Sequence, residues 1–161
     1  MKIYHGSIEQ VVAPEIRESN RTLDYGQGFY TTTSYKQAED WVRRRIGEYK
    51  VFKGYVCVYE FDEGSLQNLK ALIFDAPTDE WVDFVMQNRT QKNFVHEYDL
   101  VYGPVANDKV YAAFALYEGG LIDKKTLISE LRTYKLVDQY LFHTSEALKF
   151  VKFLEAKEVA L

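Results

Sequence analysis

Two short stretches near the N-terminus, Tyr4-His5-Gly6-Ser7 and Gly28-Phe29-Tyr30-Thr31-Thr32, decide the expected fold. Each combines β-favouring residues with a glycine, a pattern typical of a strand that meets a turn or a close neighbour. We expect a strand over residues 2–4, with His5 at its C-terminal end, and another over residues 29–33. The two glycines of the intervening turn at residues 24–28 allow its backbone to approach another group closely.

A helix should follow the second strand directly. Ser34-Tyr35-Lys36-Gln37 has the Ser-x-x-Gln spacing of a capping box, in which the serine hydroxyl accepts a bond from the helix N-terminus. Apolar residues then recur at steps of three and four, at Ala38, Trp41, Val42 and Ile46. The run Arg43-Arg44-Arg45 between them is interpreted as a solvated helix face.

The remaining pattern mixes strands and helices along one domain, residues 1–161. Residues 9–24 carry no sustained period and indicate a short helix or a loop. Strands are predicted at residues 55–61, 99–102 and 139–143, and helices at 78–88, 109–117, 123–131 and 145–156. Residues 55–61, Tyr-Val-Cys-Val-Tyr-Glu-Phe, have the strongest strand signal and should be central to a sheet. This order favours an α+β fold over repeated βαβ units.

Composition narrows the class of protein. A chain of 161 residues with 47 % hydrophobic content fits one domain with one core. The net charge of −4 gives no reason to expect a general affinity for nucleic-acid backbones. Cys57 is the only cysteine, which excludes an internal disulfide. No apolar run approaches the roughly 18 residues of a membrane span, and no signal peptide is visible, so a cytoplasmic location is expected.

Aromatic residues make up 16 % of the chain, including 13 Tyr and 10 Phe. Such rings suit either an ordinary core or a pocket for a flat, partly polar ligand. Composition alone leaves both possibilities open.

The two opening stretches together resemble the first signature strands of ADP-ribosyltransferases, in the diphtheria-toxin-like and poly-ADP-ribose-polymerase-like branch. That branch is named for its His-Tyr-Glu triad. The resemblance implies a split β-sheet core with flanking helices, and NAD as the substrate whose nicotinamide-ribose bond is cleaved. It also implies a bacterial family of single-domain toxins or defence effectors, whose genes tend to sit beside small antitoxin-like partner proteins.

The resemblance also implies roles for individual residues. His5 would bind the adenosine-side ribose, the Gly6 backbone would pair with the nicotinamide carboxamide, and Tyr30 would stack on the nicotinamide ring. Trp41 falls where the toxins carry a second stacking aromatic. The full expected NAD-binding set is His5, Gly6, Ser7, Tyr30, Thr31, Trp41 and Gln139, of which His5, Tyr30 and Gln139 would form the catalytic triad.

The third position of the triad departs from the family pattern. The late strand that matches best places Gln139 where the family usually has Glu. An amide can hydrogen-bond a ribose hydroxyl but has no charge to stabilise a developing cation. Asp138 should point to the other face of the strand. Two functions therefore stay open: ADP-ribosyl transfer to a protein or nucleic-acid acceptor, and binding of NAD, another nucleotide or a partner without chemistry.

Other candidate sites carry less weight. His96 and His143 with Glu97 and Asp99 lack the spacing of a metal site, so no metal is expected. Asn107 or Asp108 would contact substrate or cap a helix, and the cap is favoured. Arg21 and Tyr25 would reach phosphate or adenine, or would lie on the loop surface.

Overall fold

The computed structural model describes residues 1–18, 23–105 and 108–161. Two β-sheets and several helices make up the fold, which confirms the α+β class. The elements in chain order are β1 (Lys2–Ser7), β2 (Phe29–Thr31), α1 (Tyr35–Tyr49), β3 (Lys53–Phe61), the 3-10 helix η1 (Glu63–Asn68), β4 (Ala71–Ile73), α2 (Asp79–Thr90), β5 (Leu100–Pro104), α3 (Asp108–Glu118), α4 (Lys124–Arg132), β6 (Asp138–Phe142), α5 (Ser145–Leu148) and β7 (Val151–Ala160).

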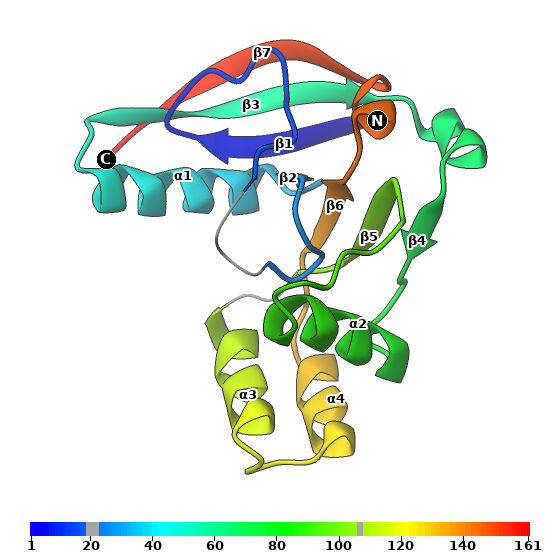
Figure 1. Cartoon of the computed structure of the whole chain (residues 1–161). Helices are drawn as coiled ribbons and strands as arrows, with labels where there is room; N and C mark the ends of the chain where they lie inside the picture. The colour runs from blue at the N-terminus through cyan, green and yellow to red at the C-terminus, as the bar shows by residue number, and fades with distance from the viewer. Residues whose placement is uncertain (19–22, 106–107) are drawn as a thin grey trace.

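The two sheets pack face to face between helices. One sheet has the strand order β1-β3-β7 and the other β2-β6-β5-β4. Helix α1 lies along the three-stranded sheet, whereas α2, α3 and α4 gather at the opposite end of the molecule (Figure 1). Strand β3 is the centre of its sheet, as its sequence predicts.

Side-chain alternation along β3 separates two of the cores. Cys57, Tyr59 and Phe61 face the second sheet and pack with residues such as Tyr140. Val56 faces the other way and packs against α1. Successive residues of a strand point to opposite faces, so one strand serves both cores.

Among the described residues, one isolated backbone bridge joins the two sheets. The Tyr4 amide donates to the Thr32 carbonyl at 2.8 Å, and the Thr32 amide donates to the Tyr4 carbonyl at 2.9 Å. The bridge is isolated, because β1 otherwise pairs with β3 and β2 pairs with β6. The first strand is longer than the predicted residues 2–4, because β1 runs to Ser7. His5 therefore lies inside the strand and not at its C-terminal end.

Helix α1 forms as its sequence predicts. The Ser34 hydroxyl accepts from the Gln37 amide at 3.2 Å, and Ala38, Val42 and Ile46 are the buried residues. The helix ends at Tyr49, and its C-cap residue Lys50 adopts a left-handed conformation with φ of 53°.

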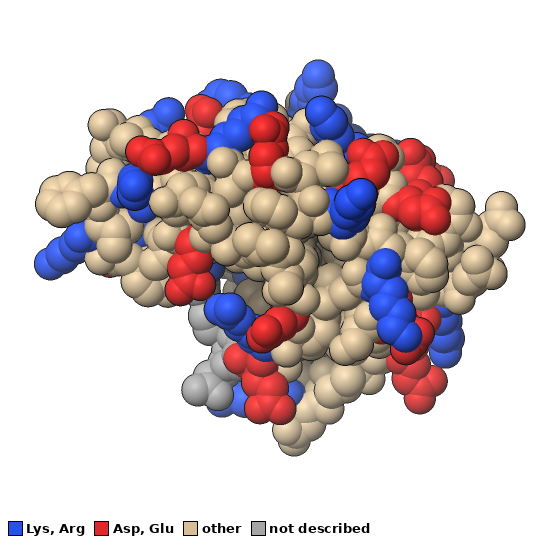
Figure 2. Space-filling view, turned by 90° about the horizontal axis from the view of Figure 1, so that it is seen from above, with Lys and Arg blue, Asp and Glu red and all other residues tan. Residues whose placement is uncertain are grey.

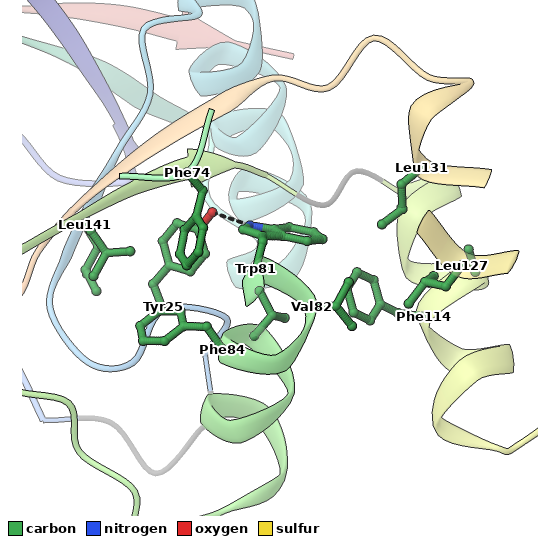
Figure 3. Packing of buried hydrophobic residues seen from close by; sticks show 12 residues of the cluster. Tyr25, Phe74, Trp81, Val82, Phe84, Phe114, Leu127, Leu131 and Leu141 are labelled. Carbon is green, nitrogen blue, oxygen red and sulfur yellow. Dashed lines mark hydrogen bonds between the residues drawn. The ribbon is translucent and has the colours of Figure 1, made fainter. Parts of the chain in front are cut away.

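A third core holds α2, α3 and α4 against the four-stranded sheet. The Trp81 indole nitrogen donates to the Tyr25 hydroxyl at 2.7 Å, and that hydroxyl donates to the Pro104 carbonyl at 2.8 Å (Figure 3). These bonds tie the loop before β2 to α2 and β5. Tyr25 is fully buried, so it belongs to this core and does not reach a ligand.

The C-terminal segment differs from the expectation of a helix over residues 145–156. Helix α5 ends at Leu148, and β7 pairs antiparallel with β3 along Val151–Ala160. Glu, Ala and Lys favour a helix here locally, but β3 offers a free edge of backbone donors and acceptors, and tertiary pairing overrides the propensity. The short strand β4 was also missed, because its three residues pair in parallel with β5 from a distant part of the chain.

The first prediction concerns Gly6, where α1 packs directly on β1. A Cβ on Gly6 would lie 2.5 Å from the Ala38 carbonyl oxygen, whereas a Cβ on Gly47 would have no neighbour within 4 Å. Gly6→Ala should therefore lower the free energy of unfolding by about 1–3 kcal/mol through overpacking. Gly47→Ala, its control in the exposed part of α1, should raise it by about 0.5–1 kcal/mol. Chemical denaturation measures both, and equal stability of the two variants would contradict this packing.

Candidate functional site

One cavity brings together all of the residues expected at the NAD site. Its volume is about 670 Å³, and its lining comes from β1, β2, α1, the loops before β2 and the start of β6. The lining includes every member of the predicted set: His5, Gly6, Ser7, Tyr30, Thr31, Trp41 and Gln139. The volume lies within the range typical of small-molecule sites, roughly 300–1,000 Å³.

His5 is held as a neutral hydrogen-bond acceptor. Its Nδ1 lies 2.7 Å from the Tyr30 carbonyl oxygen, and its ring packs 4.4 Å from that of Phe29. A carbonyl accepts only, so Nδ1 carries the proton and Nε2 has a free lone pair. Burial lowers the pKa of His5 to about 4. At neutral pH the ring can therefore accept a bond from a hydroxyl.

The Gly6 backbone faces the cavity side of β1. The N–H and C=O of Tyr4 point toward β2, and these groups alternate in direction along an antiparallel strand. The amide and carbonyl of Gly6 therefore also point away from β3. Within the described part of the chain no hydrogen bond uses them. They form a donor and acceptor pair that is open to a planar amide.

Tyr30 presents a ring whose position its own hydroxyl fixes. The hydroxyl donates to the Gly26 carbonyl and accepts from the Tyr25 amide at 3.1 Å. Burial raises the pKa of this hydroxyl well above its usual value. The ring is thus anchored at both edges of the turn before β2.

Gln139 is buried with one donor unused. It is 7 % exposed, and its Nε2 has no hydrogen-bond partner among the described residues. Leaving a buried donor unpaired costs roughly 1–3 kcal/mol. The Gln139 side chain lies beside the Tyr25 hydroxyl, where it acts against the rise in the pKa of that hydroxyl that burial causes. The neighbouring Asp138 is already engaged: its carboxylate accepts from the Thr33 hydroxyl at 2.6 Å and from the Tyr102 hydroxyl at 3.1 Å.

Helix α1 supplies an aromatic and a cationic group to the rim. Trp41 is 37 % exposed, and the Arg45 guanidinium lies 4.9 Å from its ring centroid. Arg43 and Arg44 are exposed, but Arg45 is half-buried, and both Arg44 and Arg45 line the cavity. The interpretation of the arginine run as a solvated face is therefore wrong for Arg45.

The sequence did not reveal a buried ion pair that also lines the cavity. Arg89, at the end of α2, lies 3.8 Å from an Asp24 oxygen and 3.2 Å from a Glu118 oxygen. Burial raises the pKa of Asp24. No motif signals these two ion pairs, because Asp24, Arg89 and Glu118 come from a turn and two helices that only folding brings together.

The remaining candidates lie apart from this cavity. The His96 and His143 rings stack at 4.1 Å, and each directs one nitrogen to a backbone carbonyl, those of Tyr25 and Gln27. Among the described residues no group of three His, Cys, Asp or Glu side chains could hold a metal. Arg21, Asn107 and the side chain of Asp108 lie outside the described residues. No helix in the described ranges is long and apolar enough to span a membrane.

The second prediction follows from the His5 pKa of about 4, which lies below the unfolded value of 6.5. The unfolded chain takes up the proton first, so the contribution of His5 is complete above pH 6.5 and is lost as the pH falls toward 4. His5→Asn keeps an N–H for the Tyr30 carbonyl but cannot titrate. It should reduce the pH dependence of stability in this window by up to about 1.4 kcal/mol per pH unit.

Urea denaturation between about pH 7 and about pH 4.5 measures this slope. His96, whose pKa burial also lowers to about 4, stays in the variant, so part of the slope should persist. An unchanged slope in His5→Asn would show that His5 is not held neutral.

Comparison of the sequence with known proteins shows the family to which the chain belongs. No curated protein and no solved structure matches the chain. A family model described as "Protein of unknown function (DUF3990)" matches residues 1–153, which include both opening stretches and the strand that carries Gln139. The chain therefore belongs to the DUF3990 family.

Proposed function

We propose that the protein cleaves NAD at the nicotinamide-ribose bond and transfers ADP-ribose to a macromolecular acceptor. One observation carries the proposal: residues from positions 5 to 139, expected from the resemblance alone, line a single cavity. Independent structural residues would have no reason to meet in this way. The fold proposed with this function is the split-sheet core of ADP-ribosyltransferases, and the isolated bridge between two sheets supports it.

The residues suit the parts of NAD that they would contact. The open amide and carbonyl of Gly6 match the two hydrogen-bonding atoms of a carboxamide. The anchored Tyr30 ring and the Trp41 ring offer faces to a flat cationic ring. The unprotonated Nε2 of His5 can accept from a ribose hydroxyl. Ser7 adds a hydroxyl group from β1, whereas the Thr31 hydroxyl donates to the Tyr140 carbonyl at 3.1 Å.

The proposed reaction breaks the bond between ribose C1′ and the nicotinamide nitrogen. Nicotinamide leaves with the electron pair as a neutral molecule, and the ribose carries the positive charge. A nucleophile of the acceptor attacks C1′ and loses its proton to solvent water, which neutralises the positive charge. Gln139 would orient the ribose through its buried amide. Because this amide is neutral, it supplies no negative charge to stabilise the positive charge of the ribose.

A second candidate function is supported by the same residue. Because Gln139 is neutral and the Asp138 carboxylate is occupied, the cavity also suits NAD or nucleotide binding without cleavage. In either case a small antitoxin-like protein is a proposed partner, and toxin or defence effector is the proposed role.

Basic and acidic side chains lie side by side around a hollow on the face seen in Figure 2. This mixed charge does not favour nucleic acid over protein as the acceptor.

The third prediction tests catalysis at Gln139. With NAD labelled in both the nicotinamide and the adenosine moieties, the wild-type protein and cell extract should release nicotinamide and label an acceptor. Gln139→Ala should lower both. Gln139→Glu should raise release by about 100-fold, since a positioned group that stabilises transition-state charge is worth roughly 10²–10³ in rate.

Gln67→Glu is the matched control, because it adds the same charge at an exposed position outside the cavity. It should release nicotinamide at the wild-type rate. NAD that binds to the wild type without release, combined with release by Gln139→Glu, would favour the binding function. No binding of NAD to any variant would refute both the transfer reaction and the binding of NAD without cleavage.

A further inference from the structure

Arg45 is held in a fixed position at the cavity rim. Trp41, Arg45 and Tyr49 follow one another at four-residue steps on one face of α1. The guanidinium lies 4.9 Å from the Trp41 ring and 5.8 Å from the Tyr49 ring, and its Nη1 donates to the Tyr49 hydroxyl at 3.2 Å. Stacking on aromatic faces leaves the edge of a guanidinium, with its remaining N–H donors, free to bind.

The charge of this guanidinium is not neutralised. Among the described residues no carboxylate lies within ion-pair distance of Arg45 or of Arg17, a second arginine that lines the same cavity. The lining also contains five carboxylates, those of Glu15, Glu18, Asp24, Glu48 and Asp138. None of them forms an ion pair with either arginine, so both cations are available to an anionic ligand.

The two arginines also lie near the proposed ribose contact. Arg45 and Arg17 line the same cavity as His5, and their positive charges add to the lowering of the His5 pKa that burial causes. The neutral His5 ring would accept from a ribose hydroxyl. The guanidinium groups of Arg45 and Arg17 would bind the phosphate oxygens that follow this ribose in a nucleotide. Guanidinium groups bind phosphate through paired N–H donors more strongly than neutral groups do.

We propose that Arg45, supported by Arg17, forms a diphosphate-binding subsite of the cavity, which takes the diphosphate of a nucleoside diphosphate. The identification of this ligand as the ADP portion of NAD rests on the proposed function. The residues of the run Arg43-Arg44-Arg45 would then have different roles, and Arg45 would bind the ligand. Arg43 instead faces Glu39 and the Ala160 carbonyl.

Calorimetric titration with ADP, adenosine and NAD tests this subsite in the wild type and in Arg45→Gln. The variant should bind ADP about 10- to 100-fold more weakly, since hydrogen bonds to charged groups are worth about 1.5–3 kcal/mol, and should bind adenosine as the wild type does. Arg45→Lys should show a smaller loss for ADP, because it keeps the charge but not the paired donors.

Arg43→Gln is the matched control and should leave both affinities unchanged. Equal ADP affinity in the wild type and Arg45→Gln, or no ADP binding by the wild type, would overturn the subsite even if NAD is cleaved. An Arg45-dependent affinity for ADP without nicotinamide release by the wild type would support the subsite and refute the transfer reaction. Thermal melting of each variant confirms that the fold is intact.

Discussion

The two hydrogen bonds between Tyr4 and Thr32 are the contact on which the rest of the structure depends. They are the point at which two sheets with different strand orders become one framework. The ladders of β1 with β3 and of β2 with β6 use other edges of these strands and extend beyond the bridge. The backbone of Gly6 is left unpaired beyond the bridge, and the cavity lies where a longer β1-β2 ladder would have used those groups.

Two further packing contacts set the walls of this cavity. Gly6 lets α1 approach β1 so closely that Trp41 and Arg45 reach the rim. On the other side, the Trp81-Tyr25-Pro104 hydrogen bonds hold the turn that anchors the Tyr30 hydroxyl. The position of the Tyr30 ring therefore depends on core residues that do not line the cavity themselves. Preorganised side chains of this kind lower the entropy lost when a ligand binds.

Both Asp138 and Gln139 of β6 line the cavity, but their side chains are engaged differently. Asp138 is adjacent to Gln139, yet its carboxylate bonds to Thr33 and Tyr102 while the Gln139 amide stays buried and unpaired. Exchanging the two roles would require a one-residue shift in the register of β6, which would also move Leu141 out of its core. The position of the Gln139 amide is thus tied to the register of β6 and not to a local choice of rotamer.

Local signals in the sequence by themselves determined α1 with its Ser34 cap, the central strand β3, and the candidate residues that a short motif carries, His5, Gly6 and Tyr30. Helix capping and strand alternation depend on residues that are close in the sequence, so both can be recognised without knowledge of the fold. Only the tertiary structure decided that residues 151–160 form β7, that Arg45 turns toward the cavity, and that Arg89 meets Asp24. These features depend on a free sheet edge or on partners far along the chain, and no local pattern encodes such contacts.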